Sequence, residues 1–575
     1  MFRRFDAVFL VLTILFPVVF GVGSKALVAF AVSNGSLTSE ESQVTALVNG
    51  TEAYDYDLEL EKIALGHPAF RSAGSVGANE TANWLKAQFE TFGLEAWLEP
   101  FSFTTWDLRA KPSLLIDLDG NESSTSDQVV ISSFQSEHLS WPTRSDGIFA
   151  QLVTLSLPAA ADPDEAALKT IDAAVWDAIN TTGKVVLTGK EVLGSSNFAP
   201  RAPASWRSAF LNKLYVEPPV AVVYTCWYSW NAFIPSFFGS SAGHASMGLR
   251  VPSGSVNYED GLYMRSLLDT GSPSARVVVD SVVGNGMHYN VVGRIRGSED
   301  PDRTVIVSSH YDTVMTAGFG DNGGGTAGVL ELARVFADAA RSGLYSVNYT
   351  LLFVAFAAEE FWLVGSANYV KQHKSEMANI RAVINLDCIG NDDASVTQTS
   401  TVDRLNLGQT ILRAASDLGI NAALEPPEDS DHAAFLEPAR VENVISNLWD
   451  FAGISDALPV ESSAMIISSP ILPGDKWSGG TPGWIHTSYD NSTSTQALGW
   501  VKPIKLEEQI KIAGLSVMRV QEGAVPGSSV YFPWQILVII AVVVIAVVMT
   551  VYFARVRRNP EEENRSGSSE PASGF

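Results

Sequence analysis

The sequence predicts an α/β protein: a mixed, mainly parallel sheet flanked by helices, an inserted mainly β domain and a C-terminal transmembrane helix. From His288 onward, strand-like runs alternate with helical stretches such as TAGVLELARVFADAA, as in open α/β sheets. The runs TLLFVAFAAEE and AVINLDCIG are apolar without clean alternation, which indicates strands buried on both faces. Between residues 111 and 284, short β-type runs separated by Gly, Pro and Ser predict the insert. Helical character appears there only around residues 164–179 and 259–270.

Size, charge and cysteine content narrow the possibilities. A chain of 575 residues is long for one domain, so two or three domains are expected. The 63 acidic and 38 basic residues give a formal net charge of −25, which argues against nucleic acid as a partner. Only Cys226 and Cys388 are present, which excludes a disulfide framework and a thiolate metal site. Any metal must therefore use His and carboxylate ligands, as suits Zn²⁺ or a similar divalent ion.

Both ends of the chain carry membrane-type signals. Residues 7–23 form an apolar run behind Arg3 and Arg4, so segment 1–33 is predicted to be a signal peptide or an N-terminal anchor. Residues 531–554 are apolar and long enough to span a bilayer. The basic residues that follow place the tail, residues 555–575, in the cytoplasm and the preceding chain outside the cell or in an organelle lumen. Seven N-x-S/T sequons precede residue 531 and fit that topology: Asn34, Asn49, Asn79, Asn121, Asn180, Asn348 and Asn491.

The two stretches that flank the insert, residues 54–110 and 285–525, are predicted to form one discontinuous domain. Before it, residues 34–53 are polar and are interpreted as a linker. From Tyr56 to Phe92 the spacing of apolar residues predicts two amphipathic helices, separated by the turn-rich loop HPAFRSAGSVG.

Two adjacent glutamates, Glu359 and Glu360, end the apolar run LLFVAFAAEE. One carboxylate of such a pair can bind a metal ion while its neighbour takes and returns a proton. In open α/β sheets, ligands bind beyond the carboxyl ends of the strands. Further metal-type side chains follow strand-like runs or lie in glycine-rich loops: His310, Asp312, Asp321, Asp387 and His486. Their number predicts a metal site at this edge of the sheet.

Each of these side chains has its own argument. His310 and Asp312 lie two residues apart, so an extended backbone points both to one side, where the carboxylate can orient the imidazole. Asp321 lies in the glycine-rich loop FGDNGGGTAG, which is not a P-loop because no Lys follows the glycines. Asp387 is a charge at the end of an apolar run and needs a partner such as a metal. The pair Asp431–His432 is interpreted as substrate-side or structural.

The motifs HYDT, GDNGGGTAGVLELAR, FVAFAAEEFWLVGSANYV, INLDCIG, SDHAAF and IHTSYD together resemble the co-catalytic zinc aminopeptidases of peptidase family M28, over residues 288–500. The segment that follows His67 resembles the amino-terminal helical part of that family. The resemblance implies a zinc-exopeptidase fold and two Zn²⁺ ions per chain. It implies that His310 and Asp387 hold one zinc, that Glu360 and His486 hold the other, and that Asp321 bridges the two. Glu359 would be the general base, and Asp312 the partner that orients His310.

The insert is similar to protease-associated (PA) domains, through GIFAQLVTLSLP, TTGKVVLTGKE, PPVAVVYT and VPSGSVNYEDGLYMRSLL. Such a domain would shape access to the site and carry no catalysis. The chain departs from the M28 pattern at LEPARVENVIS, where a glycine-rich turn is expected near residue 438, and at Trp362, which would narrow the cleft.

The resulting hypothesis is a membrane-anchored exopeptidase that releases amino-terminal residues from peptides. Carboxypeptidase, dipeptidase and amidohydrolase activities on the same metal site stay open, as does a non-catalytic receptor. A one-zinc glutaminyl cyclase is disfavoured by the segment AAEEFWLVGS. Oligomeric state and residue preference are not predicted.

Overall fold

The computed structural model describes residues 37–122, 127–155, 176–189, 204–225, 250–391, 393–397, 406–425, 429–468, 486, 488–494 and 500–523. The chain divides into two units, residues 1–525 and 526–575, and every described residue belongs to the first. Both predicted membrane segments, residues 7–23 and 531–554, lie outside the described ranges. Within those ranges, no helix combines the length and the apolar character needed to cross a bilayer.

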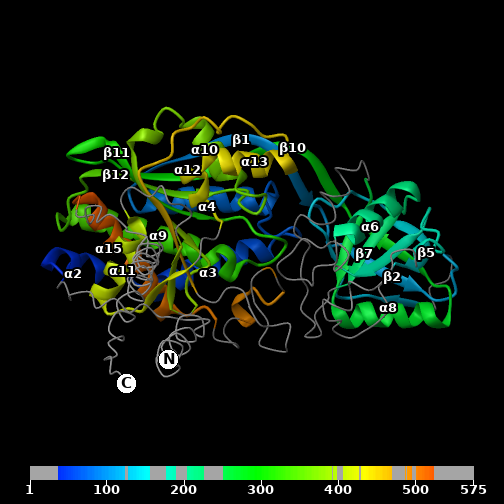
Figure 1. Ribbon diagram of the computed structural model, residues 1–575. Coiled ribbons are helices and arrows are strands. Elements are labelled where there is room, and N and C mark those ends of the chain that lie inside the picture. The colour runs from blue at the N-terminus through cyan, green and yellow to red at the C-terminus, as the bar shows by residue number, and fades with distance from the viewer. Residues whose placement is uncertain are drawn as a thin grey trace, which may run out of the picture. The chain divides into compact units, whose positions relative to one another are not determined.

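The described residues form two sheets, and the first of them is a mixed sheet with helices packed around it (Figure 1). Among the described residues it has eight strands in the order β1-β10-β12-β11-β13-β16-β14-β15. Strand β11 pairs in parallel with β12 and β13, β13 with β16, and β14 with β15, whereas β1–β10, β10–β12 and β14–β16 are antiparallel. The prediction of a mixed sheet is confirmed, and four of its seven strand pairings within the described ranges are parallel. The strand bounds are Glu95–Leu108 (β1), Ser281–Ile295 (β10), Asp300–His310 (β11), Tyr349–Phe356 (β12), Ile380–Asp387 (β13), Ala394–Thr397 (β14), Ala422–Glu425 (β15) and Ser463–Ser468 (β16).

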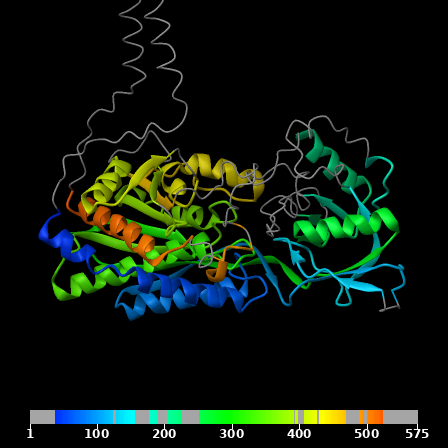
Figure 2. The ribbon, with the colours of Figure 1, turned by 90° about the horizontal axis from the view of Figure 1, so that it is seen from below.

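Helices pack on both sides of this sheet (Figures 1 and 2). Helix α9 contacts β11, β12 and β13 and is itself covered by α3, α4 and α15, whereas α10, α12 and α13 pack together and contact β10, β13 and β16. The helix bounds are Ser39–Thr45 (α2), Gly50–Leu65 (α3), Val76–Thr91 (α4), Gly325–Ser342 (α9), Val364–Gln372 (α10), Leu407–Leu418 (α11), His432–Leu436 (α12), Pro438–Leu448 (α13) and Pro503–Gln521 (α15), with short helices at Phe319–Gly324 (η3) and Met377–Asn379 (η4).

The two predicted amino-terminal helices are confirmed as α3 and α4. Each begins at a side chain that accepts backbone amides of its first turn: Asn49 caps α3 and Ser75 caps α4. The interpretation of residues 34–53 as a linker is wrong from Ser39 onward, because α2 and the start of α3 occupy this stretch. Thr38 and Glu41 form a capping box at the start of α2, and Val44 is buried. Polar composition concealed this short helix.

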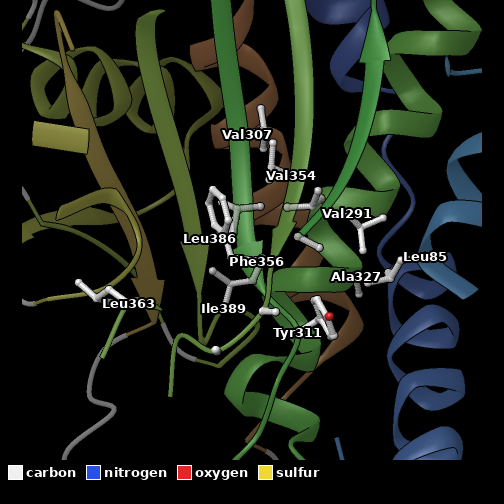
Figure 3. Packing of buried hydrophobic residues seen from close by; sticks show 14 of the residues in the cluster. Leu85, Val291, Val307, Tyr311, Ala327, Val354, Phe356, Leu363, Leu386 and Ile389 are labelled. Carbon is white, nitrogen blue, oxygen red and sulfur yellow. The ribbon is translucent and has the colours of Figure 1, made fainter. Parts of the chain in front are cut away.

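The core lies between the parallel strands and helix α9. Figure 3 shows side chains of four adjacent strands, Val291, Val307, Val354 and Leu386, packed together with Ala327 of α9. All five are buried, and β11, β12 and β13 bury almost every residue of their carboxyl halves. The apolar runs without alternation were therefore correctly interpreted as strands covered on both faces.

Residues 113–278 contribute a second sheet, ordered β3-β2-β9-β5-β6-β7-β8-β4 among the described residues. Its strands are Ser113–Asp117 (β2), Gln128–Val130 (β3), Gln135–Ser136 (β4), Ile148–Thr154 (β5), Val185–Gly189 (β6), Ala221–Thr225 (β7), Ser253–Val256 (β8) and Ser274–Val278 (β9). Helix α8, Tyr258–Thr270, confirms the helical prediction for 259–270. Helix α6, Ala204–Val216, was missed because ASWRSAFLNKLYV has no single apolar stripe. Residues 164–175 lie outside the described ranges.

Strands β1 and β10 pair antiparallel over their whole length, from Glu95 opposite Arg294 to Leu108 opposite Ser281. His288 of β10 is buried at this ribbon. Its ring stacks on Phe101, with centroids 5.3 Å apart, and its Nε2 lies 2.9 Å from the carbonyl oxygen of Thr104. Burial lowers the pKa of His288 to about 4, although the contact with Thr104 opposes the shift.

This histidine predicts a loss of stability in mild acid. In the unfolded chain, the pKa of a histidine is about 6.5. Stability is therefore not reduced by His288 above that pH, and it declines as the pH falls from about 6.5 toward the folded-state pKa of about 4. At pH 5 we expect His288 to cost about 2 kcal/mol of unfolding free energy. The loss that urea unfolding measures between pH 7.5 and pH 5 should be about 2 kcal/mol smaller in His288→Gln than in the wild-type protein. Equal losses in both proteins would contradict the prediction.

Candidate metal centre

Four of the predicted site residues lie at the carboxyl edge of adjacent parallel strands. His310 is the last residue of β11, Asp387 is the last residue of β13, and Glu359 and Glu360 lie in the turn between β12 and α10. Because β12, β11 and β13 are neighbours and run parallel, their carboxyl ends meet at one edge of the sheet. Asp321 reaches the same edge from η3, the segment that leads into α9.

Asp321 lies between the two histidines. Its Oδ1 is 3.3 Å from Nε2 of His310, and its Oδ2 is 2.8 Å from Nε2 of His486. His310 Nε2 is also 3.4 Å from Oδ1 of Asp387, and His486 Nε2 is 3.4 Å from Oε1 of Glu360. The side chains therefore form two ligand groups that share Asp321, and each group could hold a metal ion. The sequence predicted this set, and the structure brings all five residues together.

Asp312 connects His310 to the two glutamates. The Nδ1 of His310 lies 3.2 Å from the backbone oxygen of Asp312 and 3.7 Å from its Oδ1. The carboxylate of Asp312 accepts the backbone amides of Glu359, at 3.1 Å, and of Glu360, at 3.3 Å. Burial raises the pKa of Asp312 to about 6, while His310 and these amides oppose the shift. Asp312 thus holds the turn between β12 and α10, in addition to its predicted contact with His310.

A buried chain of hydrogen bonds orients Asp387. Its Oδ2 accepts the hydroxyl of Ser430 at 2.6 Å, Ser430 accepts the side-chain amide of Asn385 at 2.9 Å, and Asn385 accepts the hydroxyl of Ser308 at 2.8 Å. Oδ1 of Asp387 has no hydrogen-bond partner within the described ranges and faces His310. One oxygen is therefore fixed and the other is available to a ligand. Ser430 and Asn385 were not predicted, although they lie in the motifs SDHAAF and INLDCIG.

Asp490 and Arg71 hold the backbone of the loop that carries Asp321. Asp490 accepts the backbone amides of Gly320, at 2.6 Å, and of Asp321, at 3.3 Å. Arg71, which is fully buried, donates to the carbonyl oxygens of Tyr311, Ala317 and Gly318 at 2.9–3.0 Å. Sequence reasoning missed both residues. Their only signals were positions within motifs, Arg71 in HPAFRSAG and Asp490 in IHTSYDN.

Electrostatics and donor chemistry both fit a cation. Burial opposes charge on His310, but the carboxylates of Glu359 and Asp387 raise its pKa well above the usual value. Burial also raises the pKa of Glu360 to about 7 despite the opposing effect of His486. Oε1 of Glu360 lacks a hydrogen-bond partner among the described residues. A buried carboxylate stays ionised only where positive charge compensates it, and imidazole and carboxylate donors suit Zn²⁺.

The weaker candidates are buried away from solvent. Asp431 and His432 are both 0% exposed. Burial raises the pKa of Asp431, and the charge of His310 opposes this shift. Burial lowers the pKa of His432 to about 4, and its backbone oxygen accepts the hydroxyl of Ser463. The substrate-side and the structural interpretation of this pair both stay predictions. Cys388 is a buried free thiol, and Cys226 lies outside the described ranges.

The fold and the site define an α/β protein with a metal-type centre at the carboxyl edge of its parallel strands. Residues 290–498, which contain every candidate metal ligand named above, match the model of peptidase family M28.

Two curated relatives and one solved structure are similar to this chain. A probable zinc metalloprotease of Pyrenophora teres f. teres is 30% identical over 224 residues, covering 35% of this chain and 45% of that protein. A probable leucine aminopeptidase 2 of Aspergillus fumigatus is 29% identical over 211 residues, covering 36% and 37%. The chain thus spans less than half the length of these relatives. The structure of a zinc aminopeptidase from Bacillus subtilis has a TM-score of 0.54 at 20% identity, covering 82% of this chain and 95% of that one, and supports the fold.

Proposed function

We propose that this chain is a membrane-anchored zinc exopeptidase that removes amino-terminal residues from peptides. The observation that carries the proposal is the pair of ligand groups sharing Asp321. The match to peptidase family M28 and the similarity to a probable leucine aminopeptidase support the chemistry. The anchor rests on the apolar sequence of residues 531–554 and the basic residues behind it.

In this proposal, His310 and Asp387 would hold one zinc ion, Glu360 and His486 would hold a second, and both sites would share Asp321. Two such ions, when bound, polarise the scissile carbonyl and lower the pKa of the attacking water. The ligand carboxylates are almost fully buried, with Glu360 2% and Asp321 5% exposed.

Glu359 is proposed as the general base. Its side chain is 14% exposed, more than those of its neighbours, so it can reach a substrate at the edge of the sheet. It takes a proton from water and returns it to the leaving amine. Asp312 accepts the backbone amide of Glu359 and also lies close to His310, so it holds the base near that histidine. Burial and the neighbouring Glu360 raise its pKa, which suits a group that must accept a proton near neutral pH.

The domain arrangement is part of the same proposal. Residues 54–110 and 285–525 would form the metallopeptidase domain, and residues 111–284 a PA-like insert that shapes access. Segment 1–33 would be a signal peptide or second anchor, and residues 555–575 a cytoplasmic tail. The peptidase domain would then face the outside of the cell or an organelle lumen.

The test uses the full-length protein in detergent with a pool of peptides, half of them acetylated at the amino terminus. Mass spectrometry should show loss of single amino-terminal residues from the free peptides only. Treatment with 1,10-phenanthroline should abolish this activity, and added Zn²⁺ should restore it. Cleavage from the carboxyl end would instead indicate a carboxypeptidase. No cleavage by the zinc-loaded protein would contradict the peptidase proposal.

A further inference from the structure

A loop of the second sheet contacts Phe361, the residue that follows the glutamate pair in the sequence. His138 lies in the connection between β4 and β5, and its ring stacks on Phe361, with centroids 4.7 Å apart and an interplanar angle of 16°. The rings of Trp106 and His138 form a T-shaped pair, with centroids 5.2 Å apart. His138 is 7% exposed and Phe361 is 2% exposed, so the contact is buried.

The loop that carries His138 is itself fixed. The backbone amide of Glu137 donates to the oxygen of Ser253 in β8 at 3.0 Å, and the amide of Ser253 donates to Oγ of Ser140 at 2.8 Å. On the other side, the indole of Trp106 in β1 donates to the backbone oxygen of Ser140 at 3.0 Å. His138 is therefore presented to Phe361 from a loop anchored to both sheets.

Phe361 is held by three further contacts. Phe103 of β1 lies 5.9 Å away between ring centroids, and Trp449, at the end of α13, lies 5.3 Å away. The indole of Trp449 also donates to the backbone oxygen of Phe361 at 3.2 Å. Aromatic rings from β1, from the second sheet and from the end of α13 thus converge on a single side chain.

The turn that Phe361 belongs to depends on such support. Ala358, Trp362 and Leu363 adopt left-handed backbone conformations, with φ of 54°, 67° and 59°, although none of them is a glycine. L-residues keep these conformations only where the surroundings impose them. Asp312 holds the amides of Glu359 and Glu360 at the start of the turn. The aromatic cluster around Phe361 holds its other end.

We propose that His138 is a positioning residue for the Glu359–Glu360 turn, so that the inserted region supports the geometry of the metal centre. The ring acts as a flat, neutral aromatic surface. Its Nε2 has no hydrogen-bond partner within the described ranges, and burial lowers its pKa to about 3. Shape and stacking, rather than a polar contact, therefore carry the effect, which distinguishes His138→Phe from His138→Ala.

The first readout is hydrogen exchange, which does not depend on the proposed peptidase function. In His138→Ala, amide exchange within residues 357–364 should accelerate about tenfold or more, while exchange in β13, residues 380–387, stays unchanged. Phe361→Leu, which removes the stacking partner from the other side, should give the same pattern. His138→Phe should remain close to the wild-type protein. Unchanged exchange at 357–364 in His138→Ala would overturn the proposal.

The second readout rests on the proposed function. In His138→Ala, kcat should fall about tenfold with KM and zinc content close to wild type, and His138→Phe should restore kcat. Phe210→Ala serves as the control. Phe210 is buried in α6 of the same region and packs on Trp176, in a hydrophobic cluster separate from the one that contains Phe361. If Phe210→Ala lowers kcat and speeds exchange at 357–364 equally, the effect is general destabilisation and the proposal fails. A wild-type protein without activity would refute the proposed function, and exchange would still decide the role of His138.

Discussion

Glu359→Gln is expected to lower kcat by about a thousandfold while leaving the bound metal in place. Glutamine keeps the size of the side chain and the backbone amide that Asp312 accepts, so the turn should not move. The change removes only the ability to accept a proton. Steady-state kinetics and metal analysis of the same protein preparation measure the two properties separately.

Glu360→Gln provides the matched control, because the two glutamates are adjacent and carry the same functional group. Glu360 faces His486 at 3.4 Å and is 2% exposed, as expected for a ligand. Its substitution should remove about one metal ion per chain. Glu359 also lies 3.9 Å from Nε2 of His310 and could join a ligand group with Glu360. If Glu359→Gln loses metal and Glu360→Gln keeps it, the two roles are reversed.

The sequence was most informative where one strand determines the position of a side chain. His310, Asp387 and the glutamate pair follow apolar runs, and parallel strands bring their carboxyl ends to one edge. Strand order was not needed for that prediction, because any neighbouring arrangement of these strands gathers the same side chains. The prediction of Asp321 rested on the glycine-rich segment ahead of a helix, and this segment does lie at the site.

The sequence was least informative where a residue acts through a distant partner. Ser430 contacts Asp387 across 43 positions, Arg71 contacts Tyr311 across 240, and His138 meets Phe361 from the other sheet. Each is a common residue type in an ordinary loop, and only the folded chain shows what it touches. Helix α2 was missed for a related reason: its polar composition concealed a capping box and a few buried contacts.

Arg71→Met is expected to lower the unfolding free energy by about 3–5 kcal/mol, because it removes one partner of a buried ionic network. Arg71 is 0% exposed and donates to three carbonyl oxygens of the segment between His310 and Asp321. Its charge also faces Asp57 and Asp490. Methionine fills similar volume but leaves the carbonyls without donors and the acids without a cation. Urea unfolding of the metal-free protein measures the loss.

Asp57 makes this prediction specific. It is 0% exposed, and neither carboxylate oxygen has a hydrogen-bond partner among the described residues. Burial raises its pKa well above the usual value, and Arg71 opposes that shift. In Asp57→Asn/Arg71→Met, the acid that needs the cation is gone, so the double variant should be more stable than the sum of the single effects by about 1–3 kcal/mol.

Arg341→Met is the control for this cycle. Arg341 pairs with Asp338 on the surface of α9, and its side chain is 61% exposed, so its loss should cost less than about 1 kcal/mol. If Arg71→Met is no more damaging than Arg341→Met, the buried network does not stabilise the fold. If instead the two changes at Arg71 and Asp57 are strictly additive, the guanidinium acts only through the carbonyls of the loop.

Since that loop places Asp321 beside both histidines, Arg71→Met should also weaken metal binding. Competition with a fluorescent zinc chelator would measure this effect.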